Sequence, residues 1–116
     1  MSVAPEPYKG PSLREVQAGF ARERLRKCQT LLETLKTYPD KSGRFILYGS
    51  LARGAARHDS DLDMLVDFPP DREAAAFAFL EDACAALGID ADLRAVRHCS
   101  KKFLAHIATD MKIVQP

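Results

Sequence analysis

The sequence of 116 residues has no long hydrophobic run, almost no net charge and no paired-cysteine motif. No stretch approaches the roughly 18 apolar residues of a membrane span, and the N-terminus has no apolar core like that of a secretory signal. We therefore expect a cytoplasmic protein that does not cross a membrane. The formal net charge of +1 does not suggest broad binding to nucleic acids.

The three cysteines, Cys28, Cys84 and Cys99, are too far apart for a CxxC zinc pattern. An odd number also argues against a disulfide framework, so we interpret them as free thiols in a reducing compartment. The positions of the histidines do not indicate a Ser-His-Asp or Cys-His catalytic arrangement. These absences exclude several common hydrolase and zinc-protein patterns.

The chain has the length of a single domain. Residues 1–11 contain three prolines, a glycine and few apolar anchors, which indicates a flexible N-terminal arm. Residues 12–116 are then expected to form one domain.

Helix and strand signals alternate along this domain. Ser12 and Glu15 form a capping-box pattern for a long helix that Tyr38-Pro39 ends. Asp71 is a candidate cap for a second long helix, with Gly88 at its end. The remaining predicted elements are strands over 44–48, 61–68 and 89–96, a short helix over 51–57, and a last helix from about Lys101.

This order predicts an α/β or α+β fold in which a small mixed sheet is flanked by helices. The first two strands are joined by a short segment and could be antiparallel neighbours. The second and third are joined by a full helix, which suits a parallel crossover.

Asp61 and Asp63 begin the second predicted strand. Residues two apart on a strand face the same side, with Cα atoms about 6.5–7 Å apart, so both carboxylates can converge on one or two cations. Oxygen ligands of this kind suit Mg²⁺. The pair alone is weak evidence, because many surface strands carry such residues.

Gly49-Ser50 follows the first predicted strand. Glycine allows the backbone to approach an anion closely, and the serine hydroxyl can donate to a phosphate oxygen. Alone this is an ordinary turn, but next to Asp-x-Asp it predicts a site for a metal-bound triphosphate. A two-metal site needs a third carboxylate on a neighbouring strand. We choose Asp92 for this role and keep Asp90 as the alternative.

The sequence GSLARG at 49–54, followed by SDLD at 60–63 and Val66, resembles the signature of the DNA polymerase β-like nucleotidyltransferase superfamily, specifically its minimal nucleotidyltransferase (MNT) proteins. The resemblance implies that residues 12–116 have the polymerase β-like nucleotidyltransferase fold. It also implies that Asp61, Asp63 and Asp92 hold metal and that Gly49 and Ser50 contact the triphosphate. Arg53 matches an arginine of the same signature, and it either touches phosphate or ties the short helix to the sheet.

The resemblance further implies a Mg²⁺-dependent enzyme that transfers a nucleoside monophosphate, by our expectation AMP from ATP, to a hydroxyl. Minimal members are usually encoded with a HEPN-domain toxin and act as its antitoxin, so we expect a HEPN protein as partner and acceptor. One alternative is a catalytically weak module that neutralises the toxin by contact. Another is transfer to a small aminoglycoside-like alcohol. The sequence does not determine which nucleotide is used, whether the protein forms a homo-oligomer, or what the long first helix does.

Overall fold

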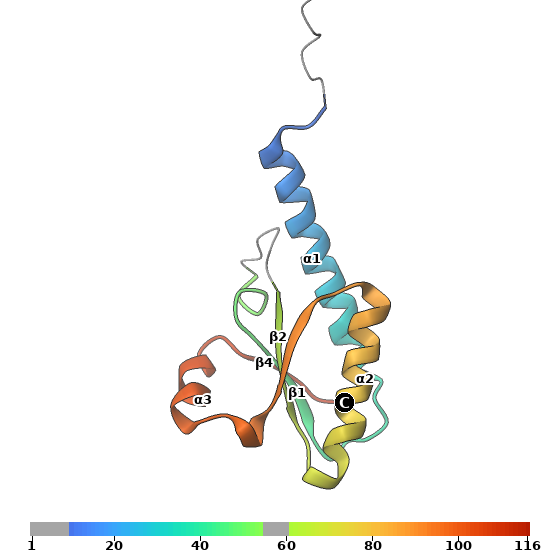
Figure 1. The fold of residues 1–116 in the computed structure, drawn as a ribbon, viewed down its shortest axis with the longest axis vertical. Helices are drawn as coiled ribbons and strands as arrows, with labels where there is room; N and C mark the ends of the chain where they lie inside the picture. The colour runs from blue at the N-terminus through green and yellow to red at the C-terminus, as the bar shows by residue number, and fades with distance from the viewer. Residues whose placement is uncertain (1–9, 55–60) are drawn as a thin grey trace, which may run out of the picture.

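The computed structural model describes residues 10–54 and 61–116, so most of the predicted N-terminal arm lies outside the described residues. Figure 1 shows three α-helices and a four-stranded sheet in this part of the chain. The elements in order are α1 (Leu13–Lys36), β1 (Arg44–Tyr48), β2 (Leu62–Asp67), α2 (Pro70–Leu87), β3 (Ala91–Ala95), the 3₁₀ helix η1 (Val96–His98), α3 (Lys101–Ile107) and β4 (Lys112–Val114). None of these helices is both long and apolar enough to cross a membrane.

The strands lie in the order β3-β2-β1-β4. β1 pairs antiparallel with both β2 and β4, and β2 pairs parallel with β3. The predicted antiparallel pair, the parallel crossover through α2 and the mixed α/β fold are therefore confirmed. The edge strand β4 was not predicted.

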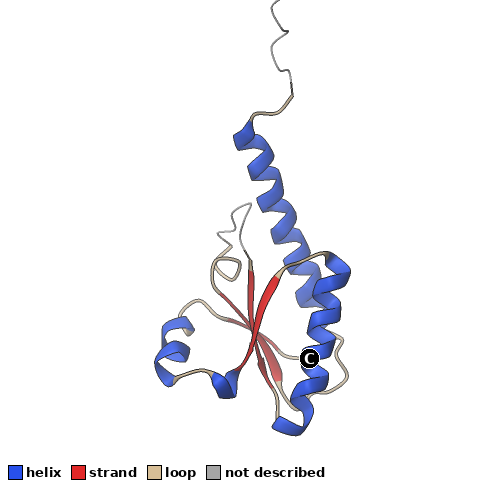
Figure 2. Cartoon of the chain, in the orientation of Figure 1, coloured by secondary structure: helices blue, strands red, loops and turns tan. Residues whose placement is uncertain are grey.

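Helices cover both faces of the sheet (Figure 2), with α1 and α2 on one side and α3 on the other. On the first side, Phe45, Leu47, Met64 and Val66 pack with buried residues of α1 and α2. On the second side, a smaller core joins Ile46, Tyr48 and Leu65 to Ile107 of α3. Because side chains alternate along a strand, the residues that share the face of Ile46 and Leu65 lie on the α3 side.

The long helix α1 begins with the predicted capping box, in which Ser12 accepts from the backbone N–H of Glu15. Its C-terminal half is anchored in the core by Leu31 and Leu35. Its N-terminal half extends beyond the sheet (Figure 1), and Phe20 there is 57% exposed. The predicted apolar stripe therefore packs on the rest of this chain only along the C-terminal part of the helix.

Two local predictions need correction. Asp71 does not cap α2: the helix begins at Pro70, no side chain caps it, and Asp71 lies in its first turn. Proline suits this position because its fixed φ is helical and its missing N–H has no partner in a first turn. Over residues 51–54 the chain forms hydrogen-bonded turns and no helix, while the rest of the predicted short helix lies outside the described residues.

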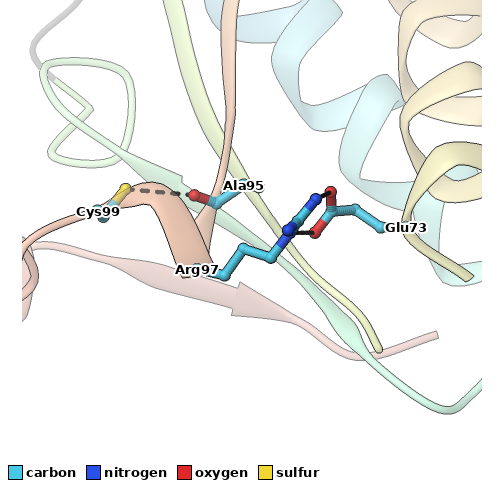
Figure 3. Close-up of polar contacts among 4 residues, drawn as sticks. All are labelled: Glu73, Ala95, Arg97 and Cys99. Atoms are coloured by element: carbon cyan, nitrogen blue, oxygen red, sulfur yellow. Dashed lines mark hydrogen bonds and ion pairs between the residues drawn. The ribbon is translucent and has the colours of Figure 1, made fainter. Parts of the chain in front are cut away.

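A charged pair joins the start of α2 to η1, directly after β3 (Figure 3). Nε and Nη2 of Arg97 donate to the two carboxylate oxygens of Glu73 at 2.9 and 3.0 Å. In the same view the thiol of Cys99 donates to the carbonyl oxygen of Ala95 at 3.5 Å. Val96 was predicted as part of the strand, but β3 ends at Ala95 and the chain turns through η1 toward α3.

Candidate active site

The parallel pairing of β2 and β3 places Asp63 directly opposite Asp92. On its other side Asp63 lies opposite Tyr48 of β1. All three residues share the sheet face of Leu65 and Ile46, which is the face covered in part by α3. The structure thus brings together two of the three predicted carboxylates on adjacent strands.

Asp61 and Asp90 lie just outside the paired strands. Leu62 pairs with Ala91, so Asp61 and Asp90 are each one residue beyond the ladder, and both are exposed. The backbone carbonyl of Asp90 accepts from the N–H of Leu62 at 3.2 Å, which closes this end of the sheet. Asp92 is therefore the better-placed partner for Asp63, and Asp61 lies at the edge of the site.

Negative charge predominates around the carboxyl group of Asp63. Partial burial raises the pKa of its carboxyl group, the negative charges of Asp92 and Asp61 raise it further, and Arg94 opposes them. Burial, followed by the negative charges of Asp63 and Asp92, also raises the pKa of Tyr48. Ionised Asp63 is thus destabilised where it stands, and a cation bound beside it would relieve that repulsion.

Gly49 lies against this carboxylate. Its φ of +80° is in the left-handed region, and a Cβ built on it would stand 2.6 Å from Oδ2 of Asp63. The turn that follows is closed by the N–H of Arg53, which donates to the carbonyl of Gly49 at 3.3 Å. Half-buried Ser50 lies within this turn. The predicted phosphate-binding turn is therefore adjacent to the predicted metal carboxylates, and only glycine fits where they meet.

The side chain of Arg53 extends from this turn toward the C-terminal part of the chain. Its Nη1 lies 3.6 Å from Oδ2 of Asp110, in the loop between α3 and β4, and both side chains are substantially exposed. This contact ties the turn to a loop beside the sheet. Because the guanidinium is exposed, it also remains accessible to a phosphate group. Ser60, the first residue of the matched SDLD motif, lies outside the described residues.

Sequence reasoning did not identify two residues that border the carboxylate pair. Nη2 of Arg94 donates to Oδ2 of Asp92 at 3.1 Å. Tyr48 is buried and meets Phe103 of α3 edge to face, with ring centroids 5.5 Å apart. The alternation of β3 does place Arg94 on the face of Asp92, so that signal was available. The contact between Tyr48 and Phe103 depends on where α3 packs.

The residues present fit a divalent cation held by few protein ligands. Among the described residues, no group of three or more His, Cys, Asp or Glu side chains is arranged to hold a metal ion. Mg²⁺ needs no such cage, because it is commonly bound through one or two carboxylates together with substrate phosphates and water. The pair of Asp63 and Asp92, beside a turn that a Cβ would obstruct, meets that smaller requirement.

Comparisons with known proteins agree with this geometry. A family model described as a nucleotidyltransferase domain matches residues 28–111. A solved structure assigned as a minimal nucleotidyltransferase is 27% identical, with a TM-score of 0.62 over 76% of this chain and 93% of that chain. No curated protein matches significantly. The predicted fold is confirmed, and the projecting N-terminal half of α1 lies outside the family match.

Two further structures share the fold at lower identity. A chain of a toxin–antitoxin complex with AMP-PNP is 24% identical, with a TM-score of 0.53, over 78% of this chain and 71% of that chain. A chain of the complex between the tri-AMPylated Shewanella oneidensis HEPN toxin and an MNT antitoxin is 20% identical, with a TM-score of 0.50, over 79% of this chain and 71% of that chain.

Proposed function

Because the chain belongs to the nucleotidyltransferase domain family, we propose that it transfers AMP from ATP to a hydroxyl group of a HEPN-domain partner protein. The observation that carries this proposal is the placement of Asp63 opposite Asp92, directly beside the Gly49-Ser50 turn. Nucleotidyl transfer needs a cation site and a phosphate site in contact, and this arrangement supports the assignment of both to this end of the sheet.

We assign Asp63 and Asp92 as the principal ligands of Mg²⁺, with Asp61 as the outer carboxylate. Bound Mg²⁺ would offset the charge that develops on the phosphate oxygens. The protein side chains provide the geometry: Asp63 is fixed between β1 and β3, and Asp92 lies on β3, which in the described residues pairs only with β2. The acceptor hydroxyl would approach from the side of Asp92.

We assign the turn after β1 to the triphosphate. The absence of a side chain at Gly49 allows a phosphate to approach the backbone, and the Ser50 hydroxyl can donate to its oxygen. Arg53 would add a charge-assisted hydrogen bond. Together these contacts would hold the α-phosphorus in line with the acceptor, and positioning of this kind accounts for a large share of catalysis in phosphoryl-type transfers.

The reaction then balances as a single displacement. The acceptor oxygen forms a bond to the α-phosphorus, and the bond from that phosphorus to the bridging oxygen of the β-phosphate breaks. Pyrophosphate leaves with the bonding electrons. The hydroxyl proton passes to a carboxylate, for which Asp92 is our choice because it borders the open side of the site.

One comparison supports a protein acceptor. One structure with the same fold contains an AMPylated HEPN toxin in complex with an MNT antitoxin. We therefore favour an antitoxin role in which AMP transfer to the toxin neutralises it.

The test is to incubate the purified protein with Mg²⁺, ATP labelled at the α-phosphate and the HEPN protein encoded beside it. We expect label on the HEPN protein, and none with Asp63→Asn or Asp92→Asn. Asp82→Asn, on the exposed face of α2, is the matched carboxylate control and should transfer normally. If no label is transferred and ATP does not bind, the enzyme proposal is wrong. If Asp63→Asn fails to transfer label yet still neutralises the HEPN protein, neutralisation occurs by contact alone.

A further inference from the structure

Arg94 forms an ion pair with Asp92, one of the two carboxylates that we assign to the metal. It lies two residues after Asp92 on β3, so both side chains emerge from the same face of the sheet. Its Nη2 donates to Oδ2 of Asp92 at 3.1 Å. A divalent cation that used this oxygen would compete directly with the guanidinium for it.

We propose that Arg94 is a built-in substitute for the metal: it neutralises Asp92 in the metal-free protein and must release that carboxylate before a divalent cation can bind. This inference rests on the metal site of the proposed function.

The ion pair between Arg94 and Asp92 is of a kind that a bound cation can replace. The side chains of Arg94 and Asp92 are 56% and 49% exposed, and ion pairs that remain in water are weak. A buried bidentate pair would hold the carboxylate much more firmly. Arg94 therefore lowers the affinity for the metal without preventing its binding.

The structure also provides space for the released side chain. Arg94 lines a cavity of about 630 Å³ at the β3 edge of the sheet, together with Phe77 of α2 and Phe103 of α3. The aliphatic part of an arginine can lie on such apolar groups while its charged end stays in water. We therefore expect Arg94 to leave Asp92 by a change of its side-chain rotamer.

The test uses Mn²⁺ as the probe and measures its dissociation constant by calorimetry and by electron paramagnetic resonance, without nucleotide. We expect Arg94→Gln to bind Mn²⁺ up to about fivefold more tightly than the wild type, which corresponds to the loss of one exposed ion pair. Arg94→Lys should retain most of the competition, because an ammonium group can also pair with Asp92. The gain should disappear when Asp92→Asn is added to Arg94→Gln.

Arg72→Gln is the matched control, because Arg72 forms an exposed pair with Asp40 at 3.2 Å, away from the site. It should leave the dissociation constant for Mn²⁺ unchanged. Equal or weaker Mn²⁺ binding by Arg94→Gln, with an unchanged circular dichroism spectrum, overturns the inference while leaving the metal site intact. If neither the wild type nor Arg94→Gln binds Mn²⁺ without nucleotide, this inference is wrong, whereas a metal site completed by substrate phosphates is not overturned.

Discussion

Gly49 and Asp63 are in such close contact that a Cβ atom on Gly49 would stand 2.6 Å from a carboxylate oxygen of Asp63. This contact joins the end of β1 to the centre of the candidate site. Gly54, a few residues later, has a similar positive φ of +69°, yet a Cβ there would meet no atom of the described residues within 4 Å. Gly49 and Gly54 therefore have similar backbone conformations, but within the described residues only Gly49 touches the site.

Substitution of these two glycines separates backbone strain from contact with the carboxylate. Gly49→Ala and Gly54→Ala should each lose about 1–2 kcal/mol of unfolding free energy, because alanine is disfavoured at positive φ. Only Gly49→Ala should also displace Asp63 and lower nucleotidyl transfer, by roughly 100-fold. Chemical denaturation and the labelled-ATP assay check the two effects. An equal loss of activity in both variants would show that the contact with Asp63 is unimportant.

Asp63 should reduce stability at neutral pH. Burial, Asp92 and Asp61 raise the pKa of its carboxyl group above the ordinary 3.8, so the folded state binds the proton more tightly than the unfolded state. Stability contributed by this group is therefore lost as pH rises from about the ordinary value through the raised one. Asp63→Asn should melt at a higher temperature than the wild type at pH 7, while transfer falls by roughly 100-fold or more.

The advantage of Asp63→Asn should shrink as the pH falls, because the wild-type carboxyl group then becomes protonated and neutral. Melting curves from pH 7 to pH 3 measure this trend. Mg²⁺ should raise the melting temperature of the wild type and not that of Asp63→Asn. A variant that is less stable than the wild type at every pH would mean that Asp63 is stabilised by contacts the structure does not show.

The centre of the site could be predicted from the sequence because it depends on strand alternation and on one crossover. Apolar runs locate β1 and β2, and the helix between β2 and β3 requires a parallel neighbour. Asp92 then lies beside Asp63 in the register that β2 and β3 adopt, although β3 begins at Ala91, two residues after its predicted start. The choice between Asp92 and Asp90 was less certain, because a change of two residues in register keeps the same face. The pairing of Asp63 with Asp92 favours the first choice.

Features that depend on long-range packing could not be predicted. β4 has only three residues, two of them exposed, and its backbone is a strand because β1 offers a free edge. The contact of Arg53 with Asp110 requires knowledge of where α3 returns to the sheet. Asp71 and Pro70 are both common near helix starts, and the fixed φ of proline decided where α2 begins.

Variants of Arg53 and of its partner Asp110 can be compared to decide between the two predicted roles of Arg53. If Arg53 binds the triphosphate, Arg53→Gln should raise the KM for ATP about tenfold, the value of one hydrogen bond to a charged group. Asp110→Asn leaves the guanidinium in place and should not raise the KM. If instead Arg53 only ties the turn to the α3–β4 loop, both variants should change the melting temperature slightly and alike, with the KM unchanged.

The pair of Glu73 and Arg97 should have the opposite pH dependence to Asp63. Hydrogen bonds from Arg97 are the main cause that lowers the pKa of the Glu73 carboxyl group below its ordinary 4.5. Its contribution to stability is thus complete above that value and is lost as pH falls through the lowered pKa. Glu73→Gln should melt below the wild type at pH 7, and the gap should close in acid. A double-mutant cycle with Arg97→Gln isolates the pair, and its coupling should be positive at pH 7 and decrease as the pH falls through the lowered pKa of Glu73. A coupling that persists unchanged in acid would show that packing of α2 on η1, rather than the charge of Glu73, holds this corner together.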